Sequence, residues 1–392
     1  MSTEHVVVVG AGLVGAASAL GLARRGWQVT LLERQAPAVQ RGALGLDIRN
    51  VALNPQSRGL LEALDVWPQA EVAPYHAMQV WEQWGQSRLN FSAADVGAEY
   101  LGWLVEASPL QVALWEACAA PDSGVEVVLG EMQALTVDAA GVHLQAGALD
   151  VRADFLLAAD GGRSAVREKL NLARREYPVA QTALATVVRC SDPHGNVARQ
   201  RFLTDGPLAL LPTPVADQVS VVWSQSADLA TERAHCDAEE FNRQLTKVSE
   251  ACLGDIVAVD QRLTFPLAQQ TVAGLLADER VLLLGDAARV VHPLAGLGVN
   301  LGFEDVLMLF DIAAADYPLY GNPRWPEYIR RRHMRGRQLV ALLHTLRRFY
   351  AQRGPLATLV RNTGVSALEN MPALKAQLMR EAMGRGPLSR VS

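Results

Sequence analysis

The stretch His5-Val-Val-Val-Val-Gly10-Ala-Gly12-Leu-Val-Gly15 decides the fold. A β-branched run of this kind is typical of a strand buried on both faces, and helix-forming residues follow the glycines. Gly10 is expected to permit a tight turn, Gly12 a close approach of backbone to a pyrophosphate, and Gly15 close packing of helix on strand. The next strand, Val29–Glu33, ends in an acid 18 residues after the last glycine. The pattern predicts a dinucleotide-binding unit.

Glu33 indicates which nucleotides fit this unit. The free N–H groups and the partial positive charge at the helix N-terminus favour phosphates. The Glu33 carboxylate can accept hydrogen bonds from ribose hydroxyls and would repel a 2′-phosphate. NAD and FAD both satisfy these requirements, so the rest of the chain must distinguish between them.

Length and composition predict an ordinary globular protein. The 392 residues suffice for two or three domains, and half of them are hydrophobic. A net charge of −5 gives no argument for nucleic acid, and none is expected as a partner. The four cysteines are scattered, so we expect no metal site, and unpaired thiols favour a reducing cytoplasm. The uncharged residues 5–23 are interpreted as part of the nucleotide unit, not as a signal peptide or membrane span.

The C-terminal region differs in charge from the rest. From Arg324 onward there are 14 Lys and Arg against 3 acids, so this region carries +11 and the remainder −16. Apolar residues have helical spacing from Leu339 to Phe349 and from Leu356 to Val360. Such a helix can lie at the inner face of an anionic membrane, or it can dock on the protein's own acidic body or an acidic partner. Both alternatives stay open.

Two further segments predict strands that end at an acidic turn. Leu156–Asp160 is an apolar strand before a glycine pair, and Ser164 is expected to cap the next helix with Arg163 and Arg167 exposed beside it. Arg280–Leu284 leads in the same way to Gly285-Asp286. Asp286 is therefore expected at the carboxyl end of a strand, where ligands of open parallel sheets bind.

Two loop segments complete the candidate site. Within His292-Pro293-Leu-Ala-Gly296-Leu-Gly298-Val-Asn300-Leu-Gly302, three glycines in seven residues predict a close approach of backbone to a ligand. The segment Asp47–Ser57 contains Arg49, which can pair with a phosphate.

Together these segments resemble the class A flavin-dependent aromatic hydroxylases, and within them the ring hydroxylases of ubiquinone biosynthesis. The chain is most like the branch that acts on the demethoxy quinol late in the pathway. The resemblance runs over nearly the whole chain. The stretches that carry it are Gly10–Gly15 with Glu33, Asp47–Ser57, Leu104–Trp115, Asp160-Gly161, Gly285–Asp305 and Met371–Gly384.

The resemblance implies FAD bound in an extended form, with its pyrophosphate on the glycine loop and its isoalloxazine near Gly298. His292 would be the titrating group beside the flavin, and Pro293 would wall the cavity. We assign both to the catalytic site. The implied cofactor-binding residues are Gly10, Gly12, Leu13, Val14, Gly15, Glu33, Arg49, Gln111, Asp160, Asp286, Gly298, Val299 and Asn300.

The chain departs from the family pattern at a few positions. Ala107-Ser108-Pro109 stand where relatives often have Asn-Arg, and Arg289 and Leu297 stand where His and Gln are usual near the flavin. A proline at a helix start is physically acceptable. Leu297 is expected to change the packing or polarity at the flavin ring.

The implied activity is hydroxylation of the ring of a polyprenylated ubiquinone precursor, with O₂ and a flavin C4a-hydroperoxide as oxygen donor. NAD(P)H would be a transient reductant without a Rossmann domain of its own, since no second GxGxxG occurs. Expected partners are the polyprenyl phenol or quinol and other proteins of ubiquinone biosynthesis. One alternative is a flavin-dependent reductase or dehydrogenase resembling the geranylgeranyl reductases. Another is a non-catalytic, FAD-containing subunit of a ubiquinone-biosynthesis complex.

The predicted fold is α/β with an α+β substrate domain. A Rossmann-like FAD-binding domain of residues 1–75, 100–180 and 270–325 would be interleaved with a mostly antiparallel sheet of residues 76–99 and 181–269. The helical basic region would span residues 326–392. β-rich runs such as Leu184–Cys190 and Val219–Trp223 predict that the second sheet covers the flavin with an apolar face.

Overall fold

The computed structural model describes residues 4–67, 72–84, 88–291, 296–314, 317–351 and 369–386. Its central element is a six-stranded sheet in the order β21-β22-β12-β1-β2-β8. Neighbouring strands are parallel, except that β21 runs antiparallel to β22. The strands are β1 (His5–Val9), β2 (Gln28–Glu33), β8 (Val125–Leu129), β12 (Phe155–Ala158), β21 (Leu276–Ala277) and β22 (Val281–Leu283).

Small residues let three helices pack closely on this sheet. Helix α1 (Leu13–Ala23) lies against α3 (Ala107–Ala119) and α7 (Gly298–Ala313). A Cβ atom at Gly21 of α1 would lie 1.9 Å from the Phe310 ring of α7, so only glycine allows this approach. The core formed here contains β1 valines, α1 alanines and leucines, and Phe303 of α7.

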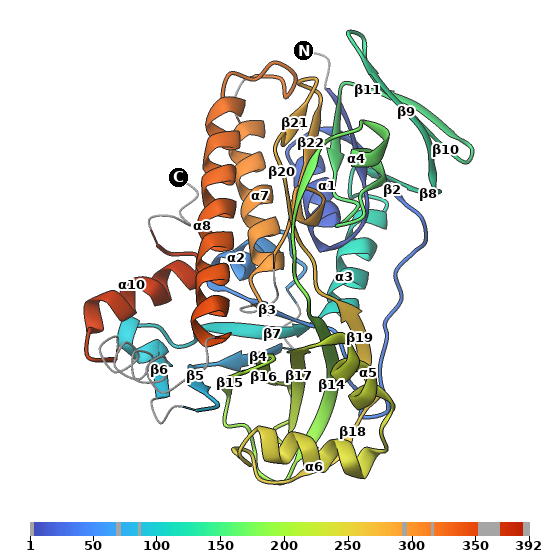
Figure 1. The fold of residues 1–392 in the computed structure, drawn as a ribbon. Helices are drawn as coiled ribbons and strands as arrows, with labels where there is room; N and C mark the ends of the chain where they lie inside the picture. The colour runs from blue at the N-terminus through green and yellow to red at the C-terminus, as the bar shows by residue number, and fades with distance from the viewer. Residues whose placement is uncertain are drawn as a thin grey trace.

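A second sheet of eight strands lies below the first in Figure 1. All its neighbouring pairs are antiparallel except β5 with β15. Helices α5 (Ala227–His235) and α6 (Ala238–Val248) pack on it. The strands are β5 (Ala77–Glu82), β6 (Arg88–Ser92), β14 (Thr182–Cys190), β15 (Val197–Leu203), β16 (Gly206–Pro212), β17 (Gln218–Gln225), β18 (Ile256–Val259) and β19 (Leu263–Pro266).

Smaller antiparallel sheets surround the two large ones. The sheet β3-β7-β4 is formed by β3 (Asn50–Leu53), β7 (Gly102–Glu106) and β4 (Val72–Tyr75), and it lies between the two large sheets in Figure 1. The other elements of this part are β9 (Met132–Asp138), β10 (Gly141–Ala146), β11 (Leu149–Ala153), β13 (Arg174–Tyr177), β20 (Gln269–Val272), β23 (Arg289–Val290), α2 (Pro55–Ala63), α4 (Ala165–Lys169), η1 (Ala93–Val96) and η2 (Gly285–Ala287).

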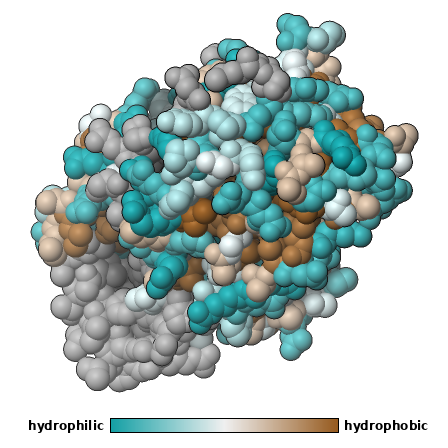
Figure 2. Space-filling model, turned by 90° about the horizontal axis from the view of Figure 1, so that it is seen from above, coloured by the Kyte–Doolittle hydropathy of each residue, from teal (hydrophilic) through white to brown (hydrophobic). Residues whose placement is uncertain are grey.

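The C-terminal region forms α8 (Trp325–Ala351), which lies alongside α7, and α10 (Pro372–Ala382) (Figure 1). Of the predicted apolar tail positions, Leu339 and Val340 are buried in an apolar cluster. Leu356, Leu359 and Val360 lie outside the described residues. Within the described chain, no helix is both long enough and apolar enough to cross a membrane. The face seen in Figure 2 mixes hydrophilic side chains with smaller hydrophobic patches.

Two arginines of α8 decide part of the question that the tail charge left open. Arg332 and Arg335 both form ion pairs with Glu304 of α7, at 2.9 and 3.2 Å. Glu304 and Arg332 are each 3% exposed. This part of the basic region therefore docks on the protein's own acidic side chains.

Candidate cofactor and substrate site

Two cavities lie end to end at the carboxyl edge of the parallel sheet, and Gly12, Ala159 and Gly161 line both. The first cavity, of about 450 Å³, reaches from β1–α1 to the second sheet. The second cavity, of about 310 Å³, reaches in the opposite direction past the end of β2. Together they provide a continuous site for an elongated ligand.

The glycine turn between β1 and α1 has the geometry that the fingerprint requires. Gly10 has φ +99°, and a Cβ there would lie 2.6 Å from the Ala159 carbonyl oxygen. At Gly15 a Cβ would lie 1.8 Å from the Gly10 carbonyl oxygen. A Cβ at Gly12, by contrast, would meet no atom within 4 Å. The backbone of Gly12 thus faces open space, beside the residues Leu13 and Val14 that line the first cavity at the N-terminus of α1.

Glu33 and Gln111 lie together in the second cavity. The Glu33 carboxylate accepts hydrogen bonds from the N–H groups of Ala11 and Arg34, at 2.6 and 2.8 Å. Gln111 donates from Nε2 to the Ala11 carbonyl oxygen at 3.2 Å. The two side chains are thereby fixed on the glycine turn, and each Glu33 oxygen keeps a lone pair for a ligand hydroxyl.

Asp160 has a buried oxygen that the protein does not satisfy. Its Oδ2 accepts from the Val166 N–H at 3.1 Å, but Oδ1 is buried without a hydrogen-bond partner in the described chain. Leaving a buried carboxylate oxygen unpaired costs on the order of 1–3 kcal/mol. Asp160 itself lines the second cavity, so this residue belongs to the wall that a ligand would meet.

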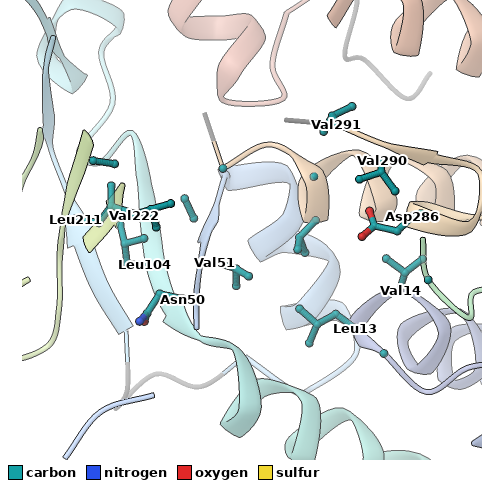
Figure 3. A pocket seen from close by; sticks show the side chains of 18 of the residues that line it. Leu13, Val14, Asn50, Val51, Leu104, Leu211, Val222, Asp286, Val290 and Val291 are labelled. Atoms are coloured by element: carbon teal, nitrogen blue, oxygen red, sulfur yellow. The ribbon is translucent and has the colours of Figure 1, made fainter. Parts of the chain in front are cut away.

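Asp286 lies in the first cavity, as Figure 3 shows, with its carboxyl group beside Val14 and Val290. It follows β22 in the short helix η2, so strand direction places it at the carboxyl edge. The side chain is exposed to the open cavity, and the surrounding protein partly desolvates it. This desolvation raises the pKa of the Asp286 carboxyl above its ordinary value, and nearby Arg289 opposes the rise.

The N-terminus of α7 borders the same cavity through Gly298 and Val299. Asn300 serves the framework instead. Its Oδ1 accepts from the Asn54 N–H at 2.9 Å and its Nδ2 donates to the Ala52 carbonyl oxygen at 2.7 Å. These bonds hold the helix start against β3 and α2, and leave the first N–H groups of α7 directed outward from the helix end.

The remaining predicted site residues differ in their positions. Arg49 is exposed and is absent from both cavity walls, and its Nη2 donates to Gln40 Oε1 at 3.2 Å. The next residue, Asn50, does line the first cavity, a position that sequence reasoning missed. His292 and Pro293 lie outside the described residues. The roles assigned to Arg49, His292 and Pro293 stay predictions.

Two of the departures from the family pattern have clear structural settings. Arg289 is 5% exposed and forms a buried ion pair with Asp305 of α7. Leu297 is the residue before α7 and packs with an apolar cluster that includes Val291. Neither side chain lines the first cavity.

Among the residues near the acidic turn, one expectation is confirmed and one is wrong. Ser164 caps α4, accepting from the Arg167 N–H at 3.0 Å, as predicted. Arg167 is not exposed, because only 2% of it is accessible. Its guanidinium donates to the carbonyl oxygens of Ala287 and Gly162, at 3.0 and 2.7 Å. It thus joins two turns that are far apart in sequence, which the local pattern could not reveal.

The second sheet supplies a wall of the first cavity that sequence reasoning did not identify by residue. Figure 3 shows Leu211 and Val222 across the cavity from Asp286. Alternation along a strand tells which residues share a face, but not which face meets the cavity. The wall residues from this sheet are Met78, Ala198, Gln200, Ala209, Leu211 and Val222.

The residues present fit FAD. The two cavities form one elongated site, with open backbone at Gly12 where a pyrophosphate would pass. Glu33 lies at one end for a ribose, and the start of α7 lies at the other, where its N–H groups suit a ring system that takes up negative charge. Asp160, which has an unpaired buried oxygen, lines the second cavity. A shorter ligand would leave one of these features unused.

Comparisons with known proteins agree with this geometry. A family model described as an FAD binding domain matches residues 3–342. The chain is 32% identical over 391 residues to the 3-demethoxyubiquinol 3-hydroxylase of Escherichia coli, covering 97% of this chain and 98% of that protein. It is 31% identical to the ubiquinone hydroxylase UbiL of Rhodospirillum rubrum, covering 97% and 89%. The solved p-nitrophenol 4-monooxygenase PnpA of Pseudomonas putida shares the fold, with TM-score 0.77, 20% identity and 99% of each chain covered.

Proposed function

The chain belongs to the FAD binding domain family that includes the ubiquinone hydroxylases, and from that premise we propose that it hydroxylates the ring of a prenylated ubiquinone precursor. The predicted family and the predicted α/β fold are confirmed by these relatives and by the shared fold. The protein is an FAD-dependent monooxygenase. The observation that carries the substrate proposal is the first cavity, whose largely apolar walls extend from Asp286 to the second sheet.

The proposed reaction uses NAD(P)H and O₂. One oxygen atom enters a ring C–H bond as a hydroxyl and the other leaves as water. NAD(P)H supplies two electrons, and one proton is taken up. When bound, FAD supplies the electron transfer and the oxygen activation that this reaction requires.

The chain's own residues would hold the cofactor at both ends. We assign the pyrophosphate to the turn around Gly12, the adenosine ribose to Glu33, and the ribitol to Asp286. The N–H groups at the start of α7 would stabilise negative charge that develops on the ring system. This division follows the order in which these groups lie along the two cavities.

The substrate ring would lie between the cofactor and the second sheet. Side chains such as Leu104, Leu211 and Val222 offer no hydrogen bonds to water, so an enclosed ring displaces solvent from the reacting carbon. A ring held in one orientation needs no further alignment before oxygen transfer. The protein therefore contributes exclusion of water and positioning.

We also propose a peripheral contact with the inner face of the membrane, where a polyprenyl substrate is dissolved, in an otherwise cytoplasmic protein. Arg330 and Arg337 of α8 and Arg380 of α10 are exposed and have no ion pair in the described chain. Such residues can bind anionic lipid headgroups. Other proteins of ubiquinone biosynthesis are the proposed protein partners.

The test is product analysis with purified, FAD-loaded protein, a short-chain prenylated phenol or quinol, NAD(P)H and ¹⁸O₂. We expect a ring product heavier by one labelled oxygen. Reduction of a prenyl double bond without label would instead support the reductase alternative. Bound FAD with neither product would support the non-catalytic subunit. Accumulation of a ring precursor in a deletion strain would identify the carbon that is hydroxylated.

A further inference from the structure

One side chain that the second sheet contributes to the first cavity is polar, whereas the others are apolar. Gln200 of β15 is 6% exposed and lines the first cavity. The other five cavity residues from this sheet are apolar: Met78, Ala198, Ala209, Leu211 and Val222. An amide in the middle of such a surface requires a physical explanation, because burying a polar group costs free energy unless it is hydrogen-bonded.

Strand register places the Gln200 amide above a floor of small residues. Gln200 lies opposite Val80 of β5 and Ala209 of β16, and Ala209 lies opposite Val222 of β17. Ala198, two residues earlier, shares its face. Because Ala198 and Ala209 end at Cβ, they leave room beside the longer amide for a flat group lying on the sheet.

The Gln200 amide has no hydrogen-bond partner in the part of the chain that the structure describes. The buried Gln270, by contrast, donates to the Gly162 carbonyl oxygen at 2.6 Å. A side chain that is more than nine-tenths buried, unpaired and open to a cavity is expected to bind whatever occupies that cavity.

We propose that Gln200 binds an oxygen substituent on the substrate ring and so decides which ring edge faces the flavin end of the cavity. This inference rests on the proposed function and names its specificity-determining residue. The amide can donate to a methoxy or carbonyl oxygen and accept from a hydroxyl, so it matches the substituents of a phenol or quinol. A ring bound to the apolar floor alone could rotate in its plane, whereas one hydrogen bond at its edge fixes the rotation.

The test combines changes in the protein with changes in the ligand. The variants are Gln200→Leu and Gln200→Met, the latter of nearly the same length in case Leu packs badly. Gln79→Leu is the matched control, since Gln79 pairs with Arg199 and therefore projects from the opposite face of the same sheet. The ligands are a short-chain methoxyphenol and two analogues, each lacking one ring oxygen. Dissociation constants are measured from the change in flavin absorbance of the FAD-loaded protein, and kcat/KM from product formed.

We expect wild type and Gln79→Leu to bind the full ring roughly tenfold more tightly than one of the analogues, as for one net hydrogen bond. In both Gln200 variants, the dissociation constants for that analogue and for the full ring should be nearly equal. Both variants should also form less product per NAD(P)H consumed. If both variants keep the wild-type ratio of the two dissociation constants, the proposal is overturned. It is also overturned if wild type binds none of these rings. Binding with the expected ratios but without hydroxylation would support Gln200 as the ring contact and reject the proposed reaction.

Discussion

Arg332 of α8 donates from Nε to Asp305 Oδ1 of α7 at 2.5 Å, and Asp305 uses its other oxygen to accept the Gly285 N–H at 3.0 Å. Arg332 also donates to the Leu301 carbonyl oxygen, in the first turn of α7, at 2.9 Å. Since Gly285 and the start of α7 both border the first cavity, one side chain of the C-terminal region supports two of its walls.

Replacing Arg332 should therefore affect both stability and cofactor binding. In Arg332→Met, Asp305 and Glu304 lose a buried partner, and we expect the free energy of unfolding to fall by about 3 kcal/mol. FAD should also bind less tightly. Urea unfolding and FAD titration measure the two effects. The control is Arg331→Met, whose exposed pair with Glu327 should contribute less than about 1 kcal/mol. Equal losses in both variants would contradict this prediction.

Gly12 offers a test of the pyrophosphate site. Its φ of −66° suits alanine, and a Cβ there meets no protein atom within 4 Å. Gly12→Ala should fold normally but place a methyl group where the cofactor passes, so we expect the Kd for FAD to rise roughly tenfold or more. Gly59→Ala, in the interior of α2 with equal space, should stabilise the protein by about 0.5–1 kcal/mol and leave the Kd unchanged. Unaltered FAD binding by Gly12→Ala would place the pyrophosphate elsewhere.

Asp286 should make stability depend on pH in the protein without FAD. Because desolvation raises its pKa in the folded state, its contribution is favourable below the ordinary value of 3.8 and is lost as pH rises through the raised pKa. The Asn side chain of Asp286→Asn does not ionise, so the variant does not lose this stability as pH rises. We therefore expect the variant to unfold at higher urea than wild type at pH 7, with the difference disappearing near pH 3.5, while binding FAD less tightly.

The matched control for Asp286 is Asp65→Asn, since that side chain is 81% exposed and its backbone φ of +51° is one that Asn adopts readily. It should follow the wild-type pH profile. A stability difference for Asp286→Asn that is the same at both pH values would exclude titration of Asp286 as its cause.

The membrane proposal predicts flotation that depends on lipid charge. The protein should rise with vesicles containing phosphatidylglycerol and remain below with pure phosphatidylcholine, and 0.5 M salt should release it. Replacing Arg330, Arg337 and Arg380 together with Gln should weaken flotation. Arg243→Gln serves as control, because Arg243 is exposed and lies on α6, which packs on the second sheet. Flotation independent of lipid charge would favour docking on a protein partner.

The positive charge of the C-terminal region could be counted from the sequence, but which of its arginines form ion pairs could not. The charge of +11 from Arg324 onward is visible in the sequence, but its use is divided in the structure. Arg332 and Arg335 form ion pairs with Glu304, which lies more than twenty residues earlier on α7, while Arg337 remains exposed. Helical spacing gives the face of each residue, but only packing decides which arginines meet an acid.

The sequence alone determined the nucleotide end of the site, because its requirements are local. The turn at Gly10, the contact that excludes a side chain at Gly15, and the acid at the end of β2 all lie within 30 residues. Short-range sterics impose the same geometry wherever that pattern occurs. The resemblance to flavin-dependent hydroxylases rested on the same kind of local motif.

The tertiary structure alone decided the ring end of the site. Gln200 and Asp286 meet one cavity although 86 positions separate them, and Arg332 supports that cavity from outside. Arg167 was expected to be exposed and is buried for the same reason, since its partners come from a distant turn. Alternation and charge specify what each residue can offer. Which residues face one another depends on how two large sheets and α7 pack, and no local pattern encodes that arrangement.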